Sequence, residues 1–409
     1  MMSTKSTKQL LMIFLVLGAA ASLFLLHPTS YPVVFRGSNS QNRKINSKNI
    51  DCAEKKNIVF LKTHKTGGTT LARIIEQYAY DNKLNVVRKI GEGGSIHFGN
   101  RNFNFDSKRL FLPPMGVESG NYEEYRYNVF TLHSRYNRPV YDAFMELNSM
   151  YITIIRDPVA QFESAFDFFH VGSILNRNTT EKPLNKTQKL ELFFEDVSAN
   201  WRNLSLTKKK FSYNNQIWDL GVDPALCTND FLIDYNIQRL DDEIDFVLIN
   251  EFYDESLIIM KKMLCWQFSD ILYLPRNQRG ERAVIDAGLS RKIAQWNAID
   301  TKMYHYFVKR LQDHIKNYGP AFQADLTAFK SMTSFLYKTC VSGEEFKRKR
   351  INYEKRGNYT SDICQSHDSL DVCDFGNGYI LTLDLNLVCE RVTSNPRALN
   401  RDIRNMMKG

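Results

Sequence analysis

Apolar residues along the chain form short runs that alternate with helical patterns. Residues 58–61 contain no polar side chain, and after a polar loop (62–70) apolar residues recur at helical spacing through residues 71–78. A second, β-branched run at 151–155 is again followed by a polar turn and a helical pattern. Short apolar runs suit buried parallel strands. Their alternation with helices predicts an α/β fold with a mainly parallel sheet.

The loop after the first strand has the composition of an anion-binding turn. It reads Lys62-Thr-His-Lys-Thr-Gly-Gly-Thr-Thr70. Glycines let the backbone approach an anion, and the first amides of the following helix point at it. Lysine precedes the glycines, so the nucleotide triphosphatase order G-x-x-x-x-G-K-[ST] is not met. The alternative is a tight strand-to-helix connection without a ligand. The residues predicted to hold a phosphate-like group are Lys65, Thr66, Gly67, Gly68, Thr69 and Thr70.

The second run is followed by a further phosphate-binding candidate. Arg156-Asp157-Pro158 comes directly after it, and Ser164 lies two turns into the helix that Pro158 begins. Proline suits the first turn of a helix because its missing N–H costs nothing there. A guanidinium binds phosphate bidentately and a serine hydroxyl adds a donor. Arg-Asp-Pro alone would fit a surface ion pair that caps a helix.

Together, these two motifs in this order resemble the Golgi carbohydrate sulfotransferases, and most of all the galactose 3-O-sulfotransferase family. The family often carries serine where this chain has Thr69 and Thr70, but the hydroxyl is retained. The resemblance implies a three-layer, P-loop-like sulfotransferase fold. It also implies 3′-phosphoadenosine 5′-phosphosulfate as the donor, with the 3′-phosphate at Arg156 and Ser164. The match spans about residues 57–310 and includes Phe98–Asp106, Phe246–Leu257, Met263–Tyr273, Trp296–Asp300 and Tyr304–Phe307.

A histidine between the two motifs is the predicted catalytic base. The apolar stretch 129–132 delivers His133 at its end, where α/β sheets place reactive groups. In the related uronyl 2-O-sulfotransferases, as in this family, a histidine at the matching place is taken as the base. Removing a proton from a sugar hydroxyl suits a group that titrates near neutrality. His64, inside the first loop, is the alternative, and either histidine also fits an ordinary hydrogen-bonded role.

The resemblance implies transfer of a sulfuryl group to the 3-hydroxyl of galactose on a glycolipid, such as galactosylceramide, or on another glycan. Lys65 would neutralise charge on the leaving phosphate oxygen together with the loop amides, so no metal is expected. A uronyl 2-O-sulfotransferase would share the motifs, and a non-catalytic lumenal carbohydrate-binding protein would share the fold. A kinase is disfavoured by the lysine placement and by the lack of an evident acidic set for Mg²⁺.

The composition is consistent with one large domain that binds anions. The chain has 409 residues, 43% of them hydrophobic, and a formal net charge of +9. A basic balance suits an anionic donor or an acidic membrane surface. No nucleic-acid motif is present, so nucleic acid is not expected as a partner. A second copy of the chain is also a candidate partner.

The N-terminus predicts a membrane anchor. Lys5 and Lys8 precede an uncharged stretch, residues 10–26, which spans roughly 25 Å as a helix. Flanking lysines favour a cytoplasmic N-terminus. The alternative is a signal peptide cleaved near residues 19–21. The expectation is a single-pass type II protein of the Golgi membrane. Its predicted parts are a cytoplasmic tail (1–9), a transmembrane signal-anchor (10–26), a lumenal stem (27–56), a sulfotransferase domain (57–335) and a cysteine-containing extension (336–409).

Sequons and cysteines also suit a lumenal protein. Asn-x-Ser/Thr begins at Asn178, Asn185, Asn203 and Asn358, three of them in a polar stretch that resembles a surface insertion. Seven cysteines leave at least one outside any intrachain pair. Cys227 and Cys265 form a candidate pair. The cysteines that would staple the tail are Cys340, Cys364, Cys373 and Cys389.

Overall fold

The computed structural model describes residues 52–91, 97–102, 105–176, 184–274, 282–341, 363–367, 370–394 and 396–408. All of them belong to one compact unit that begins at residue 51. The predicted anchor, most of the stem, and the sequons at Asn178 and Asn358 lie outside the described residues. Within the described part, no helix combines the length and the apolar character needed to cross a bilayer.

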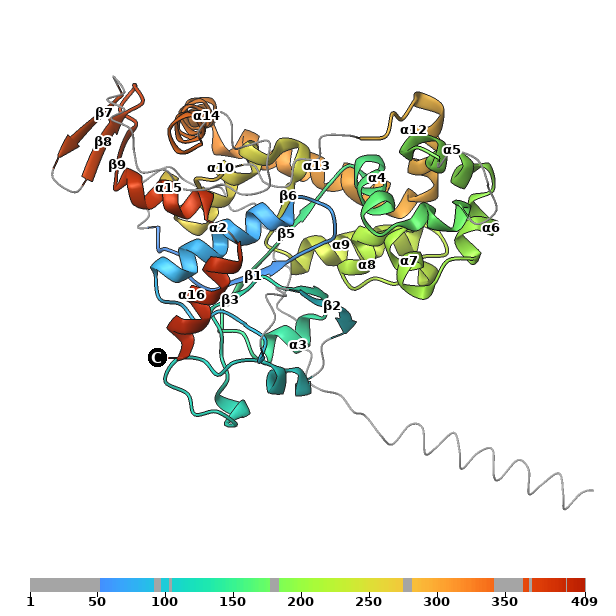
Figure 1. Ribbon diagram of the computed structural model, residues 1–409, viewed down its shortest axis with the longest axis horizontal. Coiled ribbons are helices and arrows are strands. Elements are labelled where there is room, and N and C mark those ends of the chain that lie inside the picture. Colours follow the sequence, from blue (N-terminus) through green and yellow to red (C-terminus); the bar gives the residue numbers. More distant parts are fainter. Residues whose placement is uncertain are drawn as a thin grey trace, which may run out of the picture. The chain divides into compact units, whose positions relative to one another are not determined.

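A four-stranded parallel sheet forms the centre of this unit (Figure 1). The strand order is β3-β1-β5-β6, and each neighbouring pair is parallel. The predicted α/β class with a parallel sheet is therefore confirmed. The strands are β1 (Ile58–Leu61), β3 (Val129–Phe130), β5 (Met150–Ile155) and β6 (Phe246–Ile249).

Strand β1 occupies an inner position because all four of its side chains are apolar. None is more than 3% exposed, and Val59 pairs with Phe130 on one side and Tyr151 on the other. Parallel strands start and end together, so the loops that follow β1 and β5 meet at one edge of the sheet. The two predicted anion-binding segments follow these strands. A smaller parallel pair consists of β2 (His97–Asn102) and β4 (His133–Arg135), with His97 opposite His133.

Helices pack against this sheet and against one another. Helix α2 follows β1 and contacts β3, whereas α10 and α13 contact β6. The helices of the main domain are α2 (Gly68–Asp81), α3 (Arg138–Asp142), α4 (Pro158–Phe168), α5 (Lys186–Glu195), α6 (Val197–Arg202), α7 (Leu206–Phe211), α8 (Asn215–Asp219), α9 (Asp230–Glu243), α10 (Tyr253–Leu264), α11 (Phe268–Ile271), α12 (Ala287–Trp296) and α13 (Ala298–Tyr318). Short 3₁₀ segments are η1 (Phe105–Leu110), η2 (Tyr122–Glu124), η3 (Val171–Asn176), η4 (Pro224–Leu226) and η5 (Asn250–Phe252).

The stretch around the crowded sequons folds into helices α5 and α6. Asn185 is exposed and caps α5 through a reciprocal hydrogen bond with Gln188, and exposed Asn203 ends α6. These helices and α4 share a second hydrophobic core that includes Phe162, Phe193 and Ile293. The segment therefore contributes packing around α4, in addition to surface.

The C-terminal part docks onto the helix that follows the first loop. Its elements are α14 (Ala321–Cys340), an antiparallel sheet of β7 (Cys364–His367), β8 (Leu370–Asp374) and β9 (Ile380–Leu383), and then α15 (Leu385–Thr393) and α16 (Pro396–Lys408). Helix α16 lies beside α2 (Figure 1). From α2, Arg73 donates hydrogen bonds to the Arg391 carbonyl and the Ser394 hydroxyl. Asp81 forms an ion pair with Arg391 at 2.9 Å.

Three disulfides link the unit, and one predicted pair is wrong. Cys340–Cys389 and Cys364–Cys373 staple the tail as expected. Cys265 bonds Cys52, not Cys227, which remains free and buried. The reason is local: the Lys55 amide donates to the Leu264 carbonyl (2.9 Å), which lays the start of the domain along the end of α10. The expectation of at least one cysteine outside an intrachain pair is confirmed.

The Cys52–Cys265 bond closes a loop of 213 residues, so it strongly restricts the unfolded chain. We expect the Cys52→Ser, Cys265→Ser double variant to lose about 2–5 kcal/mol of unfolding free energy. Urea unfolding followed by circular dichroism measures the loss. Cys227→Ala is the control and should lose much less, because no cross-link is removed. Equal midpoints for wild type and the double variant would contradict this prediction.

Candidate active site

The loop after β1 is a tight cradle that requires glycine at one position. Gly67 has φ +86°, which is the left-handed region, and directly precedes α2. A Cβ at Gly67 would lie 2.4 Å from the Asn250 side-chain oxygen, so a larger residue has neither the conformation nor the space. Lys65 also adopts a positive φ, of 64°. The turn therefore brings its backbone close to η5, which follows β6, and leads directly into the N-terminus of α2.

Hydroxyl groups tie this loop to the neighbouring strand. The Thr63 hydroxyl donates to the Ile154 carbonyl of β5 at 2.5 Å, and the Thr63 and Thr66 hydroxyls lie 2.7 Å apart. Both threonines are almost fully buried. Satisfied, buried hydrogen bonds of this kind hold a loop in one conformation. The loop is thus fixed before any ligand arrives.

The structure places the Arg156 side chain beside the backbone of Lys65. The Arg156 guanidinium donates to the Lys65 carbonyl at 3.3 Å. The Lys65 ammonium lies 3.8 Å from the centre of the Phe168 ring, a cation–π contact with the end of α4. The Arg156 guanidinium therefore lies against the backbone of the first loop, whereas the Lys65 ammonium lies at the end of α4.

The Arg-Asp-Pro turn has the predicted form. The Asp157 carboxylate caps α4 by accepting from the Ala160 amide at 2.9 Å, and Pro158 is the first helical residue. Ser164 is 4% exposed and lies in the second turn. The Glu251 carboxylate accepts from the Asp157 amide (3.1 Å) and faces Arg156 at 3.8 Å. The helix start is thus anchored to the segment after β6.

The two candidate bases, His64 and His133, are neighbours. Their rings stack with centroids 4.1 Å apart and 17° between planes. Nδ1 of His133 lies 2.9 Å from the Lys62 carbonyl. A carbonyl only accepts, so Nδ1 carries the hydrogen and the lone pair lies on Nε2. His133 therefore has the tautomer that a general base needs.

His64 is held by a carboxylate. Its backbone amide and its Nδ1 both lie 2.8 Å from one oxygen of Asp219. Because that oxygen accepts, His64 also carries its hydrogen on Nδ1. Phe169 and Phe211 contact the ring edge-on. The geometry thus keeps His64 as a second candidate base, with Asp219 as its positioning residue.

Sequence reasoning missed the segment that holds these groups in place. Gln216 makes paired hydrogen bonds with the Arg156 backbone, accepting from its amide at 2.8 Å and donating to its carbonyl at 2.9 Å. Gln161 of α4 donates to the carbonyl of His64 and to the side chain of Asn215, both at 3.0 Å. The signal available in the sequence was a run of three polar residues, 214–216, before apolar Ile217. The structure shows that each of the three is at most 1% exposed.

The start of α13 supplies hydrogen-bond acceptors to the backbone of this segment. Asp300 accepts from the amides of Gln216 (3.0 Å) and Ile217 (2.8 Å), and Asn297 accepts from the amide of Asn214 (2.8 Å). Burial raises the pKa of Asp300 to about 7. Asn297 and Asp300 belong to the Trp296–Asp300 stretch that resembles the family. Its role in this structure is to position α8.

Lys62, the first residue of the loop, lies among buried charges. It is 3% exposed, and its ammonium makes no hydrogen bond within the described part of the chain. Its neighbours are Glu76 and Arg88, an ion pair at 3.1 Å, and Glu76 also accepts from the Thr131 hydroxyl at 2.5 Å. Burial lowers the pKa of Lys62 to about 8. Burial of this ammonium therefore costs folding free energy. Lys62 and Lys65, although in the same loop, have different environments.

A family model described as galactose-3-O-sulfotransferase matches residues 2–358. The chain belongs to this family. The resemblance drawn from the two motifs is thus confirmed. Relatives include a galactosylceramide sulfotransferase of Bos taurus, 27% identical over 80% of this chain and 79% of the relative. The Homo sapiens galactose-3-O-sulfotransferase 3 is 26% identical over 85% of this chain and 77% of that protein.

The buried ammonium of Lys62 has a measurable consequence for stability. Its folded pKa of about 8 lies below the ordinary 10.5, so the unfolded chain binds more protons between these values and stability rises with pH. We expect Lys62→Met to raise the unfolding free energy at pH 7 by about 1–3 kcal/mol. Its advantage over wild type should shrink between pH 8 and pH 10.

Urea unfolding at pH 7, 8.5 and 10 measures this difference, and Lys292→Met, at an exposed position of α12, is the control. The control should show no comparable pH dependence. A constant advantage for Lys62→Met across the three pH values would contradict the assignment.

Proposed function

We propose that this chain transfers a sulfuryl group from 3′-phosphoadenosine 5′-phosphosulfate to the 3-hydroxyl of a galactose residue. The family membership and the names of the relatives support this reaction. The observation that carries it is the contact of the Arg156 guanidinium with the backbone of the Lys65 loop, the same loop whose His64 stacks on His133. The three-layer sulfotransferase arrangement around the sheet belongs to the same proposal.

The donor site is the cradle and the Arg-Asp-Pro turn. The donor supplies the sulfuryl group. Lys65 and the backbone of residues 66–70 would hold its phosphosulfate, because this loop leads directly into the N-terminus of α2, whose first amides suit an anion. Arg156 and Ser164 would hold the 3′-phosphate. Cationic side chains and helix-terminal amides suit a group with this charge, and their preset positions save reorganisation during the reaction.

The acceptor hydroxyl would lose its proton to His133. The Nδ1 hydrogen bond to the Lys62 carbonyl sets the tautomer, so Nε2 is the atom that receives the proton. Stacked His64 and its partner Asp219 keep the His133 ring in place. His64 is the second candidate for the base, because a carboxylate partner strengthens a histidine as a proton acceptor.

The acceptor would be a galactose-terminated glycolipid or glycan. Residues 1–9, 10–26 and 27–56 are proposed as tail, anchor and stem of a Golgi type II protein, with the catalytic domain at 57–335 and an extension at 336–409. The chain is also proposed to form a homodimer. A uronyl 2-O-sulfotransferase is the rival activity.

Transfer of labelled sulfate to a panel of acceptors tests the reaction. The panel contains galactosylceramide, lactose, a galactose-terminated glycan and a uronic-acid polymer, and the sulfated carbon is mapped by NMR. Label at carbon 3 of galactose supports the proposal. Label on the uronic acid, or on none of the acceptors, overturns it.

The base assignment is tested with two histidine variants. His133→Ala should lower turnover by about 10²–10⁴-fold, because the proton acceptor is lost. Binding of adenosine 3′,5′-bisphosphate should stay near normal, since Lys65 and Arg156 remain. Lys65→Ala should weaken both binding and turnover, and His64→Ala should cost less turnover than His133→Ala.

Asp219→Asn separates the two bases further. If His133 is the base, this variant keeps most of the turnover and the pH profile. A profile shifted by Asp219→Asn, with His64→Ala inactive and His133→Ala active, would move the base to His64.

The role of Arg156 is tested by binding alone. Arg156→Ala should weaken adenosine 3′,5′-bisphosphate binding about 10–100-fold, because a hydrogen bond to a charged group contributes about 1.5–3 kcal/mol. Calorimetry measures the affinity. Arg310→Ala, which removes an exposed arginine on α13, is the matched control and should bind normally. Unchanged affinity in folded Arg156→Ala contradicts the assignment.

A further inference from the structure

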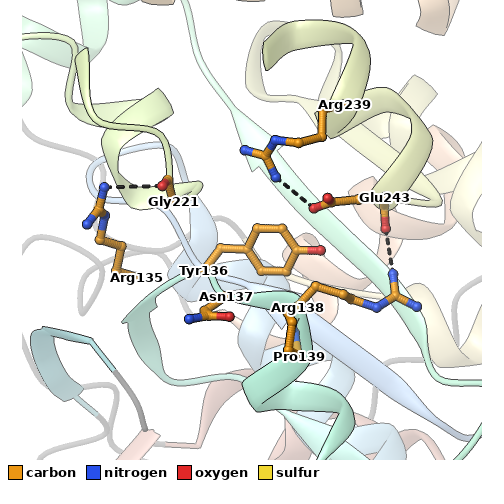
Figure 2. A pocket seen from close by; sticks show the side chains of 8 residues that line it. All are labelled: Arg135, Tyr136, Asn137, Arg138, Pro139, Gly221, Arg239 and Glu243. Atoms are coloured by element: carbon orange, nitrogen blue, oxygen red, sulfur yellow. Dashed lines mark hydrogen bonds and ion pairs between the residues drawn. The ribbon is translucent and has the colours of Figure 1, made fainter. Parts of the chain in front are cut away.

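An arginine-lined cleft lies between α3, α9 and the turn after α8 (Figure 2). Its volume is about 330 Å³, within the range of small-molecule sites. Arg135, Arg138 and Arg239 contribute three positive charges to its walls, and Glu243 contributes one negative charge. The lining therefore has a net positive charge.

The arginines retain donors that the protein does not use. A guanidinium has five N–H groups. Within the described residues, Arg135 donates to the Trp218 carbonyl (3.3 Å) and the Gly221 carbonyl (3.1 Å), and Arg239 donates to the Glu243 carboxylate (2.9 Å). Each of these two side chains is thus held in place by the protein and still has N–H groups to offer a ligand.

Arg138 is the most firmly held of the three. It donates to the Asp142 carboxylate (3.1 Å) and to the Glu243 carbonyl (2.8 Å), and it lies 3.8 Å from the centre of the Tyr151 ring. Its contribution to the cleft is mainly a fixed positive charge.

A buried hydroxyl faces the same space. Tyr136 is 5% exposed, and within the described part of the chain its hydroxyl makes no hydrogen bond of good geometry, although Arg138 and Glu243 are its charged neighbours. Figure 2 shows its ring extending across the cleft toward Arg138 and Glu243. A buried hydroxyl without a partner is costly, and a ligand that accepts from it would remove that cost. The open donors of Arg135 and Arg239, with the Tyr136 hydroxyl, offer hydrogen bonds to an acceptor in the cleft.

We propose that this cleft binds an acidic monosaccharide unit whose carboxylate accepts from the arginines and from Tyr136. Guanidinium groups match the two oxygens of a carboxylate, and the volume leaves room for a sugar ring beside it. The proposal concerns binding and does not rest on the assignment of the catalytic base.

The cleft adjoins the machinery around His64. The amide of Tyr136 donates to the Asp219 carbonyl at 2.9 Å, while the side chain of Asp219 holds His64. Gly221 has φ +88°, and a Cβ there would lie 2.4 Å from the Tyr136 carbonyl oxygen. The wall of the cleft and the support of His64 are thus parts of one tightly packed segment.

Calorimetry on the full chain tests the proposal with two matched probes. Methyl β-D-glucuronide carries a carboxylate, whereas methyl β-D-glucoside is its neutral counterpart. Excess adenosine 3′,5′-bisphosphate is present to occupy the donor site, so that binding of the glucuronide at that site does not contribute to the measured heat. The glucuronide should bind at least about 10-fold more tightly than the glucoside, because of its charge-assisted hydrogen bonds.

Tyr136→Phe and Arg239→Gln should each weaken glucuronide binding by about 10-fold. Arg401→Gln, which removes an exposed arginine of the tail, should leave it unchanged. Tyr136→Phe should melt no lower than wild type, because it removes a buried hydroxyl without a partner. If it does not fold, Arg239→Gln decides alone.

Equal binding of glucuronide and glucoside overturns the proposal, as does unchanged glucuronide affinity in both cleft variants. Inorganic sulfate is a third probe. If sulfate displaces the glucuronide with the same affinity, the cleft is a simple anion site and the sugar part of the proposal is wrong. The transfer assay with galactosides is independent of this binding test. A negative binding result therefore does not contradict the proposed sulfotransferase reaction.

Discussion

The site depends on one constraint, the need of a buried polar segment to find hydrogen-bond partners. Asn214, Asn215 and Gln216 are each at most 1% exposed. Buried polar groups without partners destabilise a fold, so such a segment can sit only where several other elements supply donors and acceptors. Here these come from the Arg-Asp-Pro turn, from α4 and from the start of α13. Satisfying the segment therefore sets the positions of three elements at once.

That segment sets the positions of the candidate catalytic and anion-binding groups. Asp219, at the end of the same helix, holds both the amide and the ring of His64, and His64 stacks on His133. Gln216 fixes the backbone of Arg156, whose guanidinium reaches the Lys65 carbonyl. Anion-binding groups and candidate bases are thus positioned by one network. Preset positions of this kind reduce the reorganisation that a reaction requires.

The C-terminal part stabilises the helix that follows the anion-binding loop. Helix α2 begins at the anion loop, and along its length it carries Arg73 and Asp81, which bind the segment around Arg391. The disulfide Cys340–Cys389 joins α14 to α15. Residues beyond the family match at 358 therefore pack on the helix that forms one wall of the candidate donor site.

The sequence by itself determined the features made by neighbouring residues. The strand-to-helix order, the cradle with Lys65 and Gly67, and the helix that starts at Pro158 all follow from local patterns, because turn geometry and helix starts depend on a few consecutive residues. These patterns were enough to identify the family and to predict the parallel sheet.

Only the tertiary structure decided which distant residues meet. The stacking of His64 on His133, the Asp219 partner and the Cys52–Cys265 bond join segments separated by about 70 to more than 200 residues. No local propensity specifies such pairs. They result from parallel strands that end at one edge of the sheet and from buried polar groups that must be satisfied. For the same reason the arginine cleft has no sequence motif, since its walls come from three separate parts of the chain.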